Sequence, residues 1–123
     1  MRKAARRISA LYDEALQPFG INVAQYSLLR LTERRQPASL TELAREAELE
    51  RSTMGRNIQV LQKLGLVEAE KGEDQREAAI RLSARGKSLI DEAQPVWADC
   101  QRRVEERAGP EAVRGLELLL ERL

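Results

Sequence analysis

Apolar residues recur at steps of three and four along most of the chain, a spacing typical of helices that bury one face. Over the first 19 residues these positions are Ala4, Ile8, Leu11, Tyr12, Ala15, Leu16 and Phe19. Pro18 and Gly20 then end the first helix. A second helix is expected over residues 22–36, because Asn22 and Gln25 can form a capping box at its start. Its apolar side carries Tyr26, Leu28, Leu29 and Leu31.

Two short helices joined by a tight turn are predicted between residues 39 and 64. Ser39 and Glu42 have the spacing of a second capping box, and Gly65 can end the second helix in a left-handed conformation. Leu49 lies in the turn. The residues expected to be buried are Leu40, Leu43, Ala44 and Ala47 in the first helix, and Met54, Ile58, Leu61 and Leu64 in the second. Such a pair is a helix-turn-helix, whose second helix can lie in the major groove of DNA.

After Gly65 the apolar period changes to two, which predicts strands. Residues 66–71 and 77–82 flank a charged loop at 72–76. The inward positions Ala78, Ile80 and Leu82 alternate with Glu77, Ala79 and Arg81. A β-hairpin directly after a helix-turn-helix describes a winged helix. The expected fold class is therefore mainly α with a small β-hairpin wing.

The remainder of the chain predicts two more helices. Ser83 can cap a long one that reaches about residue 108, and Gly109-Pro110 separates it from the last. Pro95 lies inside the long helix and predicts a kink there. Their apolar stripes consist of Leu89, Ala93, Val96, Cys100 and Val104, and of Val113, Leu116, Leu119, Leu120 and Leu123.

A winged helix formed by residues 37–82 does not need the apolar stripes on either side of it. The simplest place to bury them is against a second copy of the chain. We therefore expect one domain over residues 1–123, in which residues 37–82 form the DNA-binding module. Residues 1–36 and 83–123 would form a helical dimerisation layer, with the helix at 22–36 also supporting the module.

Composition narrows the classes of function. The 123 residues are 42% hydrophobic and 33% charged, enough for a core and a soluble surface. Histidine is absent and Cys100 is the only cysteine, which excludes Ser-His-Asp and Cys-His nucleophilic sites, imidazole zinc sites and internal disulfides. We expect no enzyme, no cofactor and no metal. Since no stretch approaches the roughly 20 apolar residues of a membrane span, a cytoplasmic protein without a membrane partner is expected.

Several segments resemble the MarR family of bacterial transcriptional regulators, and together they cover nearly the whole chain in the right order. They are Ser39-Leu-Thr-Glu-Leu-Ala44, Arg51-Ser-Thr-Met-Gly-Arg-Asn57, Leu61-Gln-Lys-Leu-Gly-Leu-Val67, Asp74-Gln-Arg76, Ile80-Arg-Leu-Ser-Ala-Arg-Gly86 and Pro95-Val-Trp97. The fourth and fifth are similar to the family's Asp-x-Arg and Leu-Thr-x-x-Gly pattern. The sequence departs from that pattern at Gln75, where many members have a second basic residue, and at Ser83, which replaces the usual threonine.

The resemblance implies a homodimeric winged helix-turn-helix protein that binds palindromic operator DNA, usually as a repressor. Many members of the family release DNA when a small, often aromatic, ligand binds. We therefore expect a sequence-specific regulator whose partners are double-stranded DNA, a second copy of the chain and a small effector.

The second helix of the helix-turn-helix divides by phase into a buried face and an exposed face. The exposed candidates for DNA contact are Arg51, Ser52, Thr53, Gly55, Arg56, Asn57 and Gln59. Arg56 can bind guanine through O6 and N7, and Asn57 or Gln59 suits adenine. Gly55 would let the backbone approach the groove closely. The alternative is an ordinary solvated face, but the wing and the order of the helices favour DNA.

The wing and the start of the preceding helix offer further candidates. Arg76 can enter the minor groove, and Asp74 is expected to orient Arg76, although a functionless surface ion pair is the alternative. Ser39 and Thr41 could donate to a phosphate, although capping alone explains Ser39. Residues 37–82 carry a net charge of −2 against +4 for residues 1–36, which counts against strong DNA binding. Affinity is therefore expected to be modest and strongly dependent on salt.

The chain's aromatic residues, Tyr12, Phe19, Tyr26 and Trp97, all lie outside the DNA-binding module. If they converge, they would line an effector pocket, but we prefer the simpler interpretation that they belong to the core. Cys100 falls on an apolar stripe with no neighbouring base, so we prefer a small buried hydrophobe to a thiol switch.

Two other classes of protein stay open. A winged helix used only for protein–protein assembly would not need Arg56 or Arg76. A dimeric enzyme would need converging acids or a nucleophile, and the carboxylates of this chain are scattered along solvated helix faces.

Overall fold

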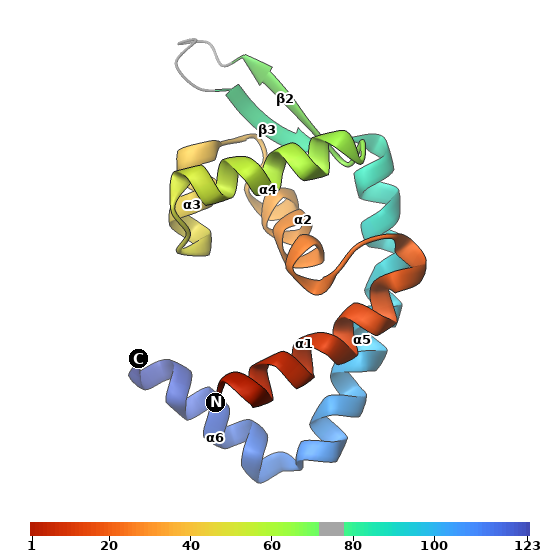
Figure 1. Ribbon diagram of the computed structural model, residues 1–123, viewed down its shortest axis with the longest axis vertical. Helices are drawn as coiled ribbons and strands as arrows, with labels where there is room; N and C mark the ends of the chain where they lie inside the picture. The colour runs from red at the N-terminus through yellow and green to blue at the C-terminus, as the bar shows by residue number, and fades with distance from the viewer. Residues whose placement is uncertain (72–77) are drawn as a thin grey trace.

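The computed structural model describes residues 1–71 and 78–123, and it divides into a lobe and a set of arms (Figure 1). The lobe contains α2 (Val23–Arg35), α3 (Leu40–Ala47), α4 (Arg51–Lys63) and a small sheet. The arms are α1 (Arg2–Leu16), α6 (Pro110–Arg122) and the part of α5 (Ala84–Ala108) that extends away from the lobe. A short 3-10 turn, η1 (Gln17–Phe19), follows α1. None of the helices in the described residues is long and apolar enough to cross a membrane.

The wing belongs to a three-stranded antiparallel sheet with the order β1-β3-β2. The predicted hairpin is present as β2 (Val67–Lys71) and β3 (Ala78–Leu82), with Val67 opposite Leu82. The third strand, β1 (Ala38–Ser39), pairs with β3 through Ala38 and Ile80. The sequence pattern does not predict β1, because two residues are too few to show alternation.

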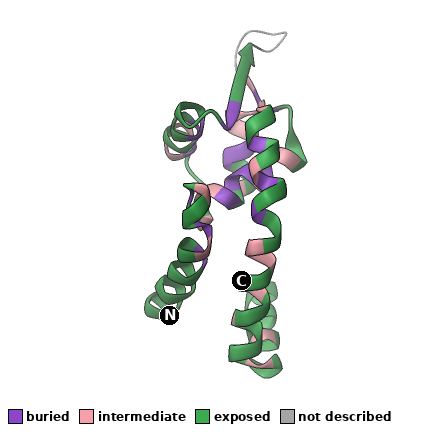
Figure 2. Ribbon diagram, turned by 90° about the vertical axis from the view of Figure 1, so that its right-hand side faces the viewer, coloured by how far each residue is buried: buried purple, intermediate pink, exposed green. Residues whose placement is uncertain are grey.

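Buried residues gather in the lobe, whereas the arms are largely exposed (Figure 2). Residues from all the helices and strands of the lobe form one hydrophobic cluster, which Leu16 of α1 and Ile90 and Ala93 of α5 also join. Thr32 is a fully buried polar residue, and its hydroxyl donates to the carbonyl of Leu28 at 2.9 Å, which satisfies it without a partner from another element.

The predicted N-caps at Asn22 and Ser39 are confirmed, with both bonds of the capping box at Asn22 and the side-chain acceptor at Ser39. The Asn22 side chain accepts from the Gln25 amide at 2.8 Å, and the Gln25 side chain accepts from the Asn22 amide at 2.9 Å, which completes a capping box. Ser39 accepts from the amide of Glu42 at 3.1 Å at the start of α3. Gly65 has a φ of +75° directly after α4, the left-handed conformation that its position requires.

One predicted core position is wrong. Leu64 is 38% exposed, because α4 ends at Lys63 and the chain reverses at Gly65, so that Leu66 takes the buried place. On α1, Ala4, Ile8 and Leu11 are exposed in the single chain, so their burial against a second copy stays a prediction. The long-helix stripe buries only part of its members, with Ala93 and Cys100 buried and Leu89, Val96 and Val104 half-buried. α5 continues as a helix through Pro95, so the kink stays a prediction.

The start of α5 is fixed to the end of α4 and to the wing by a tight junction. Ser83 accepts from the amide of Gly86 at 3.0 Å, as its predicted capping role requires, and its hydroxyl donates to the carbonyl of Gly65 at 2.6 Å. The Ser83 amide also donates to the carbonyl of Leu66 at 3.1 Å. Gly86 lies so close to the Leu66 backbone that a Cβ at Gly86 would stand 2.1 Å from the Leu66 oxygen. Only glycine fits at this position.

Substitution of Gly86 by alanine tests this junction. We expect Gly86→Ala to lower the free energy of unfolding by about 3 kcal/mol or more, because the added methyl group meets backbone atoms rather than a movable side chain. Chemical denaturation followed by circular dichroism measures the loss. Gly115→Ala in α6 is the matched control, since no heavy atom lies within 4 Å of its added Cβ. That variant should be neutral or stabilised by about 0.5–1 kcal/mol, and equal effects of the two substitutions would contradict the steric explanation.

Candidate nucleic-acid interface

α3 and α4 form the predicted helix-turn-helix, joined by the turn at residues 48–50. Glu48 adopts the left-handed conformation with a φ of 57°, and the amide of Leu49 donates back to the carbonyl of Ala44 at 2.9 Å. This conformation turns the chain sharply before α4, whose N-cap position is Glu50. On α4, Met54, Ile58 and Leu61 face the core, which leaves the opposite side of the helix exposed.

The exposed side of α4 carries a polar stripe. Ser52, Arg56 and Gln59 are exposed, and their spacing of four and three places them on one face of the helix. Lys63 continues this stripe one turn further and is also exposed. Lys63 was not among the predicted contact residues, although the same helical spacing places it on this face. We call Ser52, Arg56, Gln59 and Lys63 the outer stripe.

Two hydrogen bonds hold basic side chains at the front of the helix-turn-helix. The Arg56 guanidinium donates through Nη2 to Thr53 Oγ1 at 3.2 Å, within α4. The Arg51 guanidinium donates through Nε to Thr41 Oγ1 at 3.3 Å, which links the starts of α4 and α3. Both arginines are exposed, and the bond to Thr53 leaves the Arg56 guanidinium with further donors. The Ser39 hydroxyl oxygen caps α3, which agrees with the interpretation that capping alone explains this residue.

Two of the predicted contact residues lie on the flanks of α4 rather than in the outer stripe. Gly55 is half-buried against α3, where an added Cβ would lie 3.5 Å from Leu40 Cδ2. Asn57 lies on the other flank and lines two grooves that α4 forms with α2. Adenine contact by Asn57 and close backbone approach at Gly55 stay predictions.

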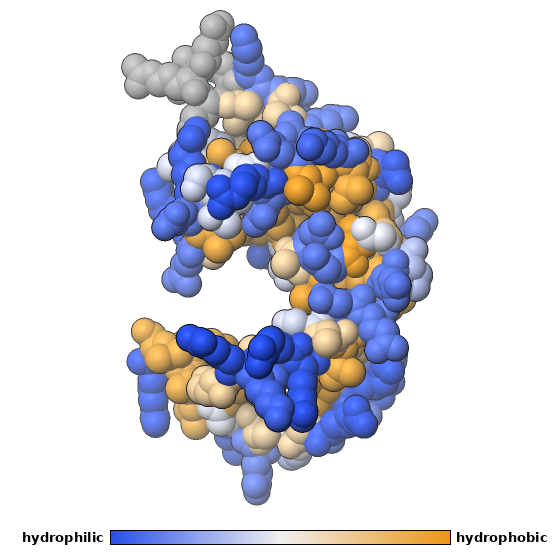
Figure 3. Space-filling view, viewed as in Figure 1, coloured by the Kyte–Doolittle hydropathy of each residue, from blue (hydrophilic) through white to orange (hydrophobic). Residues whose placement is uncertain are grey.

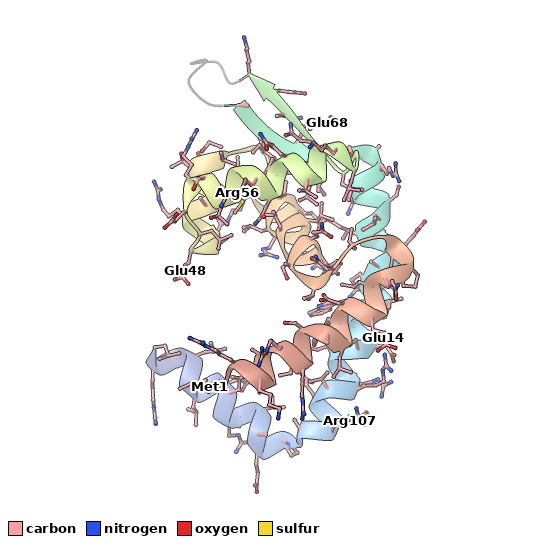
Figure 4. The ribbon with its side chains drawn as sticks, viewed as in Figure 1. Met1, Glu14, Glu48, Arg56, Glu68 and Arg107 are labelled. Carbon is pink, nitrogen blue, oxygen red and sulfur yellow. The ribbon has the colours of Figure 1, made fainter. Side chains whose placement is uncertain are left out.

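The wing candidates Asp74 and Arg76 lie outside the described residues. Within the described part of the hairpin, Glu68 and Arg81 are cross-strand neighbours, and Arg81 Nη2 lies 3.7 Å from Glu70 Oε2. On the opposite side of the lobe, Glu46 pairs with Arg35 at 2.6 Å. Figure 4 shows Glu48 and Glu68 at opposite ends of the helix-turn-helix, with Arg56 between them. These four acids, Glu46, Glu48, Glu68 and Glu70, thus lie outside the outer stripe.

Three of the four aromatic residues come together where the lobe meets the arms. The Trp97 ring lies 5.9 Å from the Tyr26 ring and 6.1 Å from the Tyr12 ring, measured between centroids. Tyr12 and Tyr26 are buried, and Phe19 packs against the hydrophobic cluster. The Tyr12 hydroxyl donates to Gln101 Oε1, and burial, then the nearby Cys100 and Glu105, raise the pKa of that hydroxyl. This packing favours the core interpretation over an effector pocket.

The remaining chemical candidates give no reactive centre. Cys100 is buried, and burial is the main cause that raises the pKa of its thiol, so the thiol stays protonated at neutral pH. Among the described residues, no group of three or more acids and cysteines could hold a metal ion.

Comparisons with known proteins agree with this architecture. The model of the MarR family matches residues 19–77. An uncharacterized HTH-type transcriptional regulator, YwoH of Bacillus subtilis (strain 168), is 29% identical over 92 residues, which cover 75% of this chain and 67% of that protein. The crystal structure of the M. tuberculosis transcriptional regulator MosR in complex with DNA is 34% identical, with a TM-score of 0.82 over 96% of this chain and 88% of that one.

A second structure supports the fold alone. An E. coli MarR variant complexed with operator DNA has a TM-score of 0.88 over 98% of this chain and 88% of that one, at 22% identity. The similarity therefore extends beyond the lobe to the arms, which the family model does not cover. With the helix-turn-helix, the wing and the long arm helices all in the same order, the chain belongs to the MarR family of transcriptional regulators.

Proposed function

We propose that this protein regulates transcription by binding double-stranded operator DNA as a homodimer, with α4 in the major groove and the wing beside it. The observation that carries the proposal is the outer stripe, which presents hydrogen-bonding side chains on an exposed helix face opposite a buried one. A helix of this kind can reach base edges while its own lobe holds it rigidly. The likeness to MosR, which forms a complex with DNA, supports the same conclusion.

Arg56 is the main candidate for base recognition. Its guanidinium is exposed, and the bond to Thr53 occupies one of its five donors. The other donors leave room for the two parallel bonds that guanine O6 and N7 accept. In this proposal Lys63 and Arg51 contact phosphates. At the wing, Arg76 enters the minor groove and Asp74 orients Arg76.

The unburied leucines of α6 support the homodimer. No residue of α6 is buried, and Leu116, Leu119, Leu120 and Leu123 are all exposed. An isolated helix of 13 residues is marginal in water, so a helix with this composition needs a partner. A groove of about 680 Å³ between α1 and α5, with Leu11, Ala15, Cys100 and Val104 among its lining residues, offers apolar surface for a second copy. Figure 3 shows apolar atoms spread over the arms.

The finer parts of the proposal follow the family resemblance. We infer a repressor of palindromic sites, since a two-fold dimer presents two copies of α4 to two half-sites. We also infer release by a small effector and a cytoplasmic location. Residues 37–82 would then act as the DNA-binding module, with the arms as the dimerisation layer and α2 supporting both.

Fluorescence anisotropy with DNA from upstream of the protein's own gene, against scrambled DNA and across a salt series, tests DNA recognition. We expect Arg56→Ala to weaken binding to the native fragment by about 1–3 kcal/mol and to relax the base preference. Arg56→Lys is the matched control, because it keeps the charge but loses the planar fork. Arg56→Lys should bind scrambled DNA as the wild-type protein does, and should lose the preference for the native fragment. Absence of binding to either fragment, even at low salt, would instead favour a protein–protein assembly module.

Light scattering coupled to size exclusion tests the homodimer. We expect the wild-type chain to elute with twice its chain mass and Leu120→Glu to shift it toward the monomer, because a charge would have to be buried in an apolar interface. Leu64→Glu is the control, since Leu64 is an exposed leucine of the lobe, away from the arms. A wild-type monomer, or a dimer that both variants leave intact, would contradict this assignment of the interface.

A further inference from the structure

Gln36 joins the end of α2 to the middle strand of the wing sheet. It follows α2 directly, with an extended backbone, and its amide donates to the carbonyl of the fully buried Thr32 at 2.8 Å. Its side chain reaches β3, where Oε1 accepts from the amide of Leu82 at 2.8 Å. The backbone of Gln36 is thus fixed to α2, while its side chain holds a strand 46 residues further along the chain.

This bond takes the place of a backbone bond that β1 is too short to make. β1 pairs with β3 through Ala38 and Ile80. In an antiparallel pair the same register places Gln36 opposite Leu82, and the amide of Leu82 points to the same side of β3 as that of Ile80. The backbone of Gln36 does not continue the strand, because β1 begins at Ala38 and the Gln36 amide is bonded to α2. The side-chain carbonyl of Gln36 therefore supplies the acceptor.

Leu82 lies at the root of the wing, where the hairpin joins the lobe. Leu82 is buried, and the next residue, Ser83, begins the junction with α5. On one side β3 is paired with β2 over five residues, but β2 is an edge strand that moves with it. On the other side β3 has the two residues of β1 and the bond from Gln36. Loss of that acceptor would leave a covered amide unsatisfied, and the end of the strand would shift to restore a partner.

A small shift at the root becomes a large one at the far end of the wing. Figure 1 shows the hairpin of β2 and β3 projecting away from the helices of the lobe. At about 3.3 Å per residue, a strand of five residues is roughly 16 Å long. A rotation of about 10° at its root therefore moves its other end by about 3 Å, the length of a hydrogen bond.

We propose that Gln36 is a positioning residue for DNA binding, whose bond to Leu82 fixes the angle at which the wing meets the DNA. The inference rests on the proposed function, in which Arg76 enters the minor groove. Arg76 lies outside the described residues, and Gln36 acts on it only through β3. The contribution of Arg76 to affinity then depends on an amide side chain at the end of α2.

Hydrogen exchange of the Leu82 amide, followed by NMR on the full chain without DNA, tests the bond itself. We expect Gln36→Met to speed this exchange about tenfold or more, because methionine keeps the length of the side chain and places a methyl group where Oε1 accepts. Gln36→Glu keeps an acceptor and should stay close to the wild type. Gln94→Met is the matched control, since Gln94 is exposed on α5 and makes no side-chain hydrogen bond within residues 1–71 and 78–123. Unchanged exchange in Gln36→Met would overturn the inference.

A double-mutant cycle tests the positioning role, with fluorescence anisotropy on the native DNA fragment as the measurement. We expect Arg76→Ala to weaken binding about tenfold in the wild-type background and only about twofold to threefold in the Gln36→Met background. The Gln36→Glu and Gln94→Met backgrounds should keep the full tenfold effect. A purely structural role of Gln36 would lower stability and leave the effect of Arg76→Ala unchanged.

Two results of this cycle contradict the positioning role while DNA binding itself stands. One is a full effect of Arg76→Ala in the Gln36→Met background, and the other is the absence of any effect of Arg76→Ala in the wild-type background. If the wild-type protein binds no DNA at all, the proposed function fails and the positioning role fails with it. The affinity of the wild-type protein therefore separates the two failures.

Discussion

The close contact between Gly86 and the backbone of Leu66 is the constraint on which the arrangement of the lobe depends. Three segments end or begin there, namely α4, β2 and α5. Ser83 bonds to Gly65 and Leu66, which connect α4 to β2, and to Gly86 at the start of α5. The ion pair between Lys87 and Glu33, 2.9 Å long, joins α5 to α2 nearby. Its lysine is 57% exposed, so solvent screens the pair and it adds little to stability. The steric fit of Gly86 against Leu66 therefore sets the direction in which α5 leaves the lobe, and the ion pair of Lys87 with Glu33 is secondary to it.

The sequence pattern predicted the elements of the lobe well because their signals are local. Asn22, Ser39 and Ser83 are caps that act within three residues, and Gly65 marks a left-handed turn that needs no tertiary information. On the arms the same periodicity identifies an apolar face but not what covers it. Ile8 and Leu11 repeat as a core face would, yet they are exposed in a single chain, and their burial against a second copy stays a prediction. Periodicity reports which face is apolar, whereas burial depends on what covers it.

The candidate site could be predicted only as far as the phase of one helix. Arg56 and Gln59 follow from the position of Met54 and Ile58, and Lys63 would have followed from the same rule. Asn57 and Gly55 differ, because their surroundings come from α2 and α3, which pack on either flank of α4. The residues next to Asn57 and Gly55 in the chain do not indicate that α2 and α3 pack there. The hollow between α2, the end of α3 and one flank of α4 could not be predicted for the same reason, since its lining comes from separate segments of the chain.

The aromatic cluster lies where the lobe is joined to the arms, with Tyr12 on α1, Tyr26 on α2 and Trp97 on α5. Trp97 is the only tryptophan of the chain. Its indole is packed against one ring from each side of that joint, so a rotation of the lobe relative to the arms must change its surroundings. The fluorescence of this single unlabelled residue would therefore report any change in the angle between the lobe and the arms.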